Sequence, residues 1–332
     1  MGNEATNQSP GPNAAAFPVS DHCDGRRFFN PSGHVNRTLR EILRWKTGAR
    51  PAAWPARVGV ESRPPPAVPQ GDALLATWVG HATFLIQSRP AAILTDPVWS
   101  ERVGPAGLLG PRRVHAPGIP YEALPRIHVV LLSHDHYDHC DLRTLGRLAR
   151  EFQPVVVTPL GNGGLCRRAG LQRVIELDWW QHCEAVPGVE VTLTPARHWS
   201  KRLTGPRNGR LWGGFSIATV GRRAHFTGDT GYDAGVFTDI RSRLGAPDLA
   251  LIPIGAYEPR WFMAPQHCDP EEAVRIHRDL GASVSLAMHW GCWQLTDEPR
   301  DAPLQALAWA RAAAGLPEQA FQTPQPGDTV CI

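Results

Sequence analysis

Short hydrophobic runs separated by turn residues dominate the chain from residue 74 to its end. Apolar or β-branched runs of this kind, bounded by Gly, Pro, Asn or Asp, are typical of buried strands. Strand and helix patterns alternate, so we expect an α/β (α+β) protein with two strand-rich halves. We predict strands at 74–79, 83–86, 92–95, 127–132, 155–158, 174–177, 189–194, 215–220, 225–227, 249–254 and 284–287, and an edge strand at 328–332.

Helical periodicity marks fewer segments. The clearest begins after Asp269, where Asp at the N-cap, Pro at the first position and Glu at the third start a helix that Gly281 ends. The Pro-rich segment 50–70 has neither period, and we predict an irregular strap across the surface. Other helices are predicted at 37–46, 142–150, 165–169 and 302–314.

Composition indicates one enzyme-sized domain. The chain has 332 residues, of which 42% are hydrophobic and 20% are charged, which favours a well-buried core and argues against disorder. Residues 1–20 are rich in Asn, Pro, Gly, Ala and Ser without periodicity, so we expect a flexible leader there and a single domain over 21–332. The net charge of +3 comes with scattered arginines, which argues against a nucleic-acid partner.

Cysteine usage and hydropathy bear on the compartment. The seven cysteines are an odd number without a Cys-x-x-Cys pair, so we expect a reducing compartment, the cytoplasm, and neither a disulfide framework nor a thiolate zinc site. No stretch approaches the roughly 18 apolar residues that a membrane span needs. A transmembrane segment is therefore not expected.

A cluster of histidines and acids follows the strand predicted at 127–132. His134, His136, Asp138 and His139 stand within six positions, and imidazole and carboxylate at this spacing suit two metal ions that share one loop. Three later strand-like runs also end near a metal-competent residue. Because open sheets place ligands beyond strand ends, we expect the clusters to converge. The later residues are His198, Asp229 and His289.

The motif His134-x-His136-x-Asp138-His139 resembles the signature of the metallo-β-lactamase-fold hydrolases. Other segments look like the branch that contains N-acyl-phosphatidylethanolamine phospholipase D and its bacterial relatives. The resemblance covers about residues 21–330 and implies a four-layer αββα sandwich with its site at one edge of two facing sheets. The similar segments are 77–83, 94–97, 195–199, 212–215 and 228–231.

The resemblance also implies a ligand set for two zinc ions per chain, although other divalent metals stay open. One zinc would be held by three histidines, the other by one aspartate and two histidines, with Asp229 bridging them. The bridging water would lose its proton and attack as hydroxide. The ligands implied are His134, His136 and His198 for one ion, and Asp138, His139 and His289 for the other.

We assign catalytic roles to Asp138 and to Asp96 and His267, two further positions that match the phospholipase branch. Asp96 would orient a ligand imidazole; its structural alternative is to cap the turn before Pro97. His267 would bind a phosphate oxygen or protonate the leaving group, or it is purely structural. For His81, a buttressing and a reactive role are equally open.

Several other residues near the motifs have two interpretations. Cys140 and Cys292 have no partner spacing and are interpreted as buried spectators. Tryptophans near the site, such as Trp199 and Trp290, either line an apolar pocket or pack in the core, and core packing is favoured. Five arginines either recognise phosphate or form a solvated face: Arg197, Arg202, Arg207, Arg210 and Arg260.

The first functional hypothesis is a dinuclear zinc phosphodiesterase of phospholipase D type that acts on a lipid-like or small diester. A lactonase or other esterase would use the same site. A non-catalytic metal-binding scaffold is the alternative from another class, and the intact ligand set with Asp138 argues against it. No clear amphipathic segment supplies a membrane-binding face. Peripheral membrane contact and the oligomeric state, including a dimer, stay open.

Overall fold

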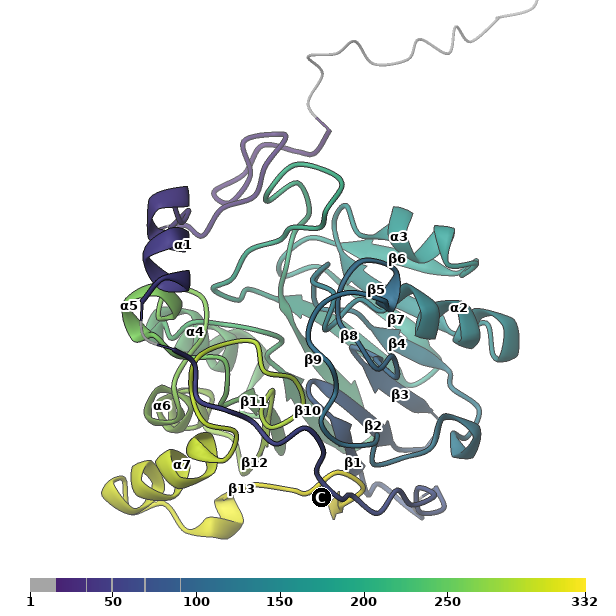
Figure 1. Ribbon diagram of the computed structural model, residues 1–332. Coiled ribbons are helices and arrows are strands. Elements are labelled where there is room, and N and C mark those ends of the chain that lie inside the picture. The colour runs from purple at the N-terminus through teal and green to yellow at the C-terminus, as the bar shows by residue number, and fades with distance from the viewer. Residues whose placement is uncertain (1–15, 34, 49, 69, 90) are drawn as a thin grey trace, which may run out of the picture.

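Two facing seven-stranded sheets form the centre of the computed structural model, which describes residues 16–33, 35–48, 50–68, 70–89 and 91–332. Figure 1 shows α2 and α3 beside the first sheet, and α4, α6 and α7 beside the second. The predicted α/β class and four-layer arrangement are therefore confirmed.

The first sheet has the strand order β14-β1-β2-β3-β4-β5-β6. The strands from β3 to β6 pair in parallel, whereas β14, β1, β2 and β3 pair antiparallel. Every residue of β2, β3, β4 and β5 is buried, as expected for apolar runs covered on both faces. The strands are Leu75–Gly80 (β1), Thr83–Gln87 (β2), Ala92–Thr95 (β3), Val129–Leu131 (β4), Val155–Pro159 (β5), Val174–Leu177 (β6) and Thr329–Cys331 (β14).

The second sheet has the order β13-β12-β11-β10-β9-β8-β7. Its antiparallel half runs from β7 to β10, and its parallel half from β10 to β13. The sequence did not predict β7, in which only Ala185 is fully buried, or β13, which has two residues. The strands are His182–Val186 (β7), Val189–Thr194 (β8), Gly214–Thr219 (β9), Arg222–Phe226 (β10), Leu249–Pro253 (β11), Val284–Met288 (β12) and Phe321–Gln322 (β13).

The helices begin and end near the predicted residues where capping signals were present. In α6, Asp269 accepts from the backbone N–H of Glu272 in a capping box, and Gly281 ends the helix at φ 65°. The sequence missed α4 and α5. The helices are Leu39–Lys46 (α1), Leu142–Glu151 (α2), Gly163–Arg168 (α3), Ala234–Leu244 (α4), Arg260–Met263 (α5), Pro270–Leu280 (α6) and Ala302–Ala313 (α7), with 3-10 turns at Pro105–Gly107, Tyr121–Ala123 and Glu318–Ala320.

Two apolar clusters hold the strand ends in place. The larger includes Trp78, Phe215 and Phe226, and the smaller includes Leu132 and Leu145. Each of these side chains is at most 1% exposed, and burying one large apolar side chain stabilises the fold by roughly 1.5–3 kcal/mol. The loops that follow the strands are thus fixed to a rigid scaffold.

The predicted strap is confirmed, because residues 50–68 form no helix or strand. Trp54 Nε1 anchors it by donating to the Glu298 carbonyl at 2.9 Å. Most of the predicted leader, residues 1–15, lies outside the described residues; within the remainder, Phe17 packs on Phe28 with ring centroids 4.8 Å apart. No helix in the described part of the chain is long and apolar enough to span a membrane.

Candidate metal centre

All seven residues predicted as metal ligands lie together beyond the strand ends of the two sheets. They follow β4, β8, β10 and β12, so each sheet contributes ligands to one buried cluster. His134, His139, His198, Asp229 and His289 are each at most 3% exposed. The buried strands that precede these residues hold their backbone in a fixed position.

The first group consists of His134, His136 and His198. His136 Nδ1 lies 2.9 Å from His134 Nε2 and 3.2 Å from His198 Nε2. His198 Nδ1 donates to the Gln266 carbonyl at 2.9 Å, and burial holds the pKa of His198 well below its usual range. The neutral ring has one proton, which is on Nδ1, so its Nε2 directs a lone pair at His136.

The spacing of these nitrogens fits a common cation. Ligand atoms around a tetrahedral zinc with bonds of about 2.0–2.1 Å lie roughly 3.3 Å apart. Burial also lowers the pKa of His134 well below its usual range, so this ring is neutral too. His136 Nε2 is buried without a hydrogen-bond partner. The nitrogen lone pairs of these rings therefore face one another, with too few protons between them to form hydrogen bonds. Such a group of lone pairs is what a metal ion binds.

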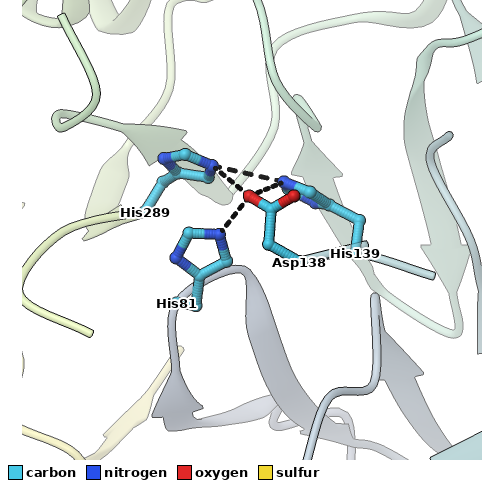
Figure 2. Close-up of side chains that lie close together, drawn as sticks. All are labelled: His81, Asp138, His139 and His289. Carbon is cyan, nitrogen blue, oxygen red and sulfur yellow. Dashed lines mark hydrogen bonds and ion pairs between the residues drawn. The ribbon is translucent and has the colours of Figure 1, made fainter. Parts of the chain in front are cut away.

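The second group contains His81, Asp138, His139 and His289 (Figure 2). The Nε2 atoms of His139 and His289 lie 3.2 Å apart. Asp138 Oδ2 lies 3.4 Å from His139 Nε2 and 3.5 Å from His289 Nε2. Two imidazoles and a carboxylate thus meet at one point, as predicted for the second ion.

Asp229 lies between the two groups. Its Oδ2 is 3.1 Å from His139 Nε2, 3.7 Å from His198 Nε2 and 3.9 Å from His134 Nε2. Its Oδ1 is 3.1 Å from His289 Nε2. One carboxylate therefore contacts histidines of both groups, the arrangement that a bridging ligand needs.

The charges of the second group also fit a cation. Burial disfavours ionisation of Asp229, but the charges of His139 and His289 outweigh it and hold its pKa well below the usual range. Burial lowers the pKa of His139 and His289, but Asp229 and Asp138 outweigh it, so the pKa of His139 lies well above its usual range and that of His289 rises to about 9. Protons on two rings thus balance two buried carboxylates, and a divalent cation would replace those protons.

Asp96 lies directly behind the ligands. Its Oδ2 accepts from His139 Nδ1 at 2.7 Å and from Ser133 Oγ at 2.5 Å. Since the Ser133 hydroxyl donates to Asp96, it accepts from His134 Nδ1 at 2.8 Å. One carboxylate therefore accepts the Nδ1 proton of His139 directly and orients that of His134 through a hydroxyl. Burial raises the pKa of Asp96, and the bonds from His139 and Ser133 oppose this shift.

His267 lies at the open side of the cluster. Its Nδ1 is 4.0 Å from Asp229 Oδ2 and has no hydrogen-bond partner. Its ring centroid is 5.1 Å from that of His198. Burial lowers its pKa to about 4, against the charge of Asp229, so the ring is neutral at pH 7. A neutral ring offers a hydrogen bond rather than a positive charge.

His81 is the residue whose role the sequence left open. It stands at φ 56° in the turn between β1 and β2, and its carbonyl accepts from Trp78 Nε1 and from the backbone N–H of His289. Burial, with the charge of His289, lowers its pKa to about 3. Its neutral ring donates from Nε2 to Asp138 Oδ2 at 3.0 Å. A left-handed turn that aims an imidazole at a ligand carboxylate is the signal that sequence reasoning missed.

The cysteines near the motifs lie in the core, whereas some of the tryptophans lie against the metal centre. Cys140 and Cys292 are fully buried, as predicted, and burial raises the pKa of both thiols to about 12. The Trp199 ring lies 4.5 Å from the His136 ring, and Trp293 lies edge-on at 4.9 Å from His81. Trp290 stacks on Trp78 in the core at 5.2 Å. Two of these indoles therefore contact rings of the centre.

Comparisons with known proteins agree with this geometry. Residues 91–290 match the family described as Beta-lactamase superfamily domain. The N-acyl-phosphatidylethanolamine-hydrolyzing phospholipase D 1 of Caenorhabditis elegans is 38% identical over 270 residues, which cover 77% of this chain and 75% of the relative. An uncharacterized protein of Mycobacterium tuberculosis is also 38% identical, over 89% of this chain and 79% of the relative.

Solved structures share the fold at low identity. The metallo hydrolase Igni18 of Ignicoccus hospitalis aligns with a TM-score of 0.58 at 20% identity and covers 78% of this chain and 98% of its own. A possible metal-dependent hydrolase of Veillonella parvula aligns with a TM-score of 0.62 at 14% identity, over 77% of this chain and 98% of its own.

Proposed function

The chain belongs to the beta-lactamase superfamily and is a metal-dependent hydrolase, and from this premise we propose that it is a dinuclear zinc phosphodiesterase of the phospholipase D type. The observation that carries the proposal is the pair of buried donor groups that share Asp229. The name of the Caenorhabditis elegans relative supports a lipid-like substrate. With seven free cysteines, a reducing compartment such as the cytoplasm is part of the proposal.

Each group would hold one ion. The three nitrogens of His134, His136 and His198 would bind the first; Asp138, His139 and His289 would bind the second, with Asp229 common to both. When bound, the two ions would lower the pKa of a coordinated water and neutralise charge on the attacked phosphoryl group.

The chain's own residues would prepare the donors and receive the substrate. Asp96 accepts the Nδ1 proton of His139 directly and holds that of His134 through Ser133, so Nε2 of each ring would bind an ion once the ion displaces the Nε2 proton of His139. His81 donates to Asp138 and fixes its orientation. His267 is neutral and has no partner on Nδ1 among the described residues. A neutral ring can donate a hydrogen bond to a phosphoryl oxygen, so we favour this role over protonation of the leaving group.

The test combines metal analysis with a substrate panel. Wild type and Asp138→Asn would be assayed with phosphodiesters, lactones and N-acyl phospholipids, and Asp239→Asn, an exposed carboxylate on α4, is the control. We expect about two zinc ions per chain, turnover of diesters, and a loss of turnover in Asp138→Asn alone. Unchanged turnover in Asp138→Asn would refute the mechanism, and hydrolysis of lactones alone would replace the substrate class. A metal content near zero after mild purification would favour the scaffold.

A further inference from the structure

The loop between β8 and β9 contains four arginines that differ in what they contact. Arg197 reaches the Tyr232 carbonyl at 3.5 Å. Arg202 donates to the carbonyls of Asp135 and Cys140 at 2.6 and 3.0 Å. Arg210 forms an ion pair with the Asp135 carboxylate at 2.8 Å. Both therefore hold the segment around the metal motif in place. Among the described residues, Arg207 has neither kind of contact.

Arg207 is a half-buried cation without an anionic partner among the described residues. Its guanidinium carbon lies 4.1 Å from the centre of the Trp199 ring. Its Nε is buried and has no acceptor. Burial lowers the pKa of Arg207, and no neighbouring carboxylate offsets this shift. A desolvated cation without a partner is costly, which is a reason to look for an external anion.

A hollow of about 330 Å³ lies next to Arg207. Residues of the segment from Asp24 to Phe29 also line it, and the backbone N–H of Phe28 ties this segment to the Asn208 carbonyl at 2.9 Å. Arg27 also lines the hollow. Asp24 is the one carboxylate among the described lining residues, and it accepts from the backbone N–H groups of Arg26 and Arg27. The two arginines of the lining thus outnumber this one acid, which already has two backbone donors.

Arg207, which lines the hollow, is linked to the metal centre through Trp199. The Arg207 guanidinium stacks on the Trp199 ring, and this ring also contacts the His136 ring, with centroids 4.5 Å apart. Arg207 and the first metal group are therefore neighbours of the same indole. An anion bound to Arg207 would lie one aromatic ring away from a group bound at the metals.

We propose that Arg207, Arg27 and Trp199 form a subsite for a second anionic group, a phosphate or carboxylate, on a substrate whose scissile diester lies at the metal centre. Arg suits this role because its planar fork matches the oxygens of both groups while it stacks on an indole. The inference rests on the proposed function for the position of the scissile group. Two groups held at once also fix the register of the substrate.

The test uses two p-nitrophenyl phosphodiesters that differ only at the far end of the second alcohol, a butyl chain or a chain that ends in a carboxylate. Wild type is expected to prefer the carboxylate substrate in kcat/KM, mainly through KM. In Arg207→Gln this preference should fall about 10- to 100-fold, as for the loss of a charged hydrogen bond. Arg207→Lys should retain part of it. A phosphonate-ended chain in place of the carboxylate shows which oxyanion is preferred.

Arg243→Gln is the matched control, because Arg243 also stacks on an indole, at 4.3 Å from the Trp180 ring, but contacts none of the metal-site residues. It should keep the wild-type preference. Equal kcat/KM for the two substrates in wild type, or a preference that survives Arg207→Gln, would overturn the subsite.

Binding separates failure of the subsite from failure of the proposed function. Non-hydrolysable phosphonates with and without a terminal carboxylate would be titrated calorimetrically into the metal-loaded protein. If diesters are not turned over but Arg207→Gln still weakens only the carboxylate ligand, the subsite stands and the phosphodiesterase assignment fails. If both ligands bind equally to wild type and Arg207→Gln, the subsite fails whatever the turnover.

Discussion

Replacing Asp96 by Asn is expected to weaken metal binding at both groups of the centre. Asp96 Oδ1 accepts from the Ser133 backbone N–H at 2.7 Å, and Oδ2 accepts from Ser133 Oγ and His139 Nδ1. An amide has only one acceptor oxygen. Whichever way Asn is oriented, its NH₂ group therefore faces at least one buried donor.

The size of the effect follows from these contacts. A buried donor left without an acceptor costs about 1–3 kcal/mol, and loss of such a contact behind a metal ligand typically lowers metal affinity about 10- to 100-fold. Asp96 stands at φ 31°, a backbone conformation that Asn tolerates well. The fold should therefore survive, and the loss should fall on metal affinity.

Chelator competition on metal-stripped protein would measure the two affinities. Ser133→Ala is the matched variant, because it removes the hydroxyl between Asp96 and His134 but leaves the bond from Asp96 to His139. We expect it to weaken one affinity only, whereas Asp96→Asn weakens both. The reasoning would be refuted if Asp96→Asn bound both ions as tightly as wild type.

Three further predictions concern single histidines. His267→Ala should lower kcat/KM by about 10²- to 10³-fold equally for alkyl and p-nitrophenyl leaving groups, since the neutral ring stabilises a phosphoryl oxygen; a larger loss for the alkyl diester would instead identify a proton donor. His81→Gln should weaken the metal group that contains Asp138 about 10- to 100-fold and change the visible spectrum of the cobalt(II)-substituted protein; an unaltered spectrum and affinity would leave His81 a structural residue. Burial lowers the pKa of His22, but the carboxylates of Asp178 and Asp21 outweigh burial, and the pKa lies above its usual value. The protonated ring therefore stabilises the fold fully below about pH 6.5, and this stabilisation is lost as pH rises through the raised pKa. His22→Gln should therefore reduce the free energy of unfolding more at about pH 5.5 than at about pH 9 in urea denaturation, and an equal loss at both would contradict it.

Most of the fold was predictable because its strands are continuous apolar runs. Strands such as β5 and β11 are buried at every position, so apolar composition alone identifies them. The missed elements lack this property. In α4 only Phe237 and Ile240 are buried, which leaves too weak a period to recognise.

The clustering of the seven proposed ligands was predictable for a different reason. His134, His136, Asp138 and His139 form a local motif, and the other ligands follow recognisable strand ends. Their supporting residues carry no such pattern. Ser133 is an ordinary serine until its hydroxyl is found between Asp96 and His134, and the orientation of His81 depends on a left-handed turn.

The partners of the arginines near the site could not be predicted from the sequence either, and these partners bear on function. By type and position, Arg202, Arg207 and Arg210 are equivalent in the sequence, and each suits phosphate recognition equally well. The fold separates them, because Asp135 and nearby carbonyls take up two of the three. Among the described residues Arg207 has neither an anion nor a carbonyl as partner and stacks on an indole that contacts His136, so it is the arginine of these three able to select a substrate. Substrate preference in this chain would then depend on which cation is unpaired rather than on how many cations surround the site.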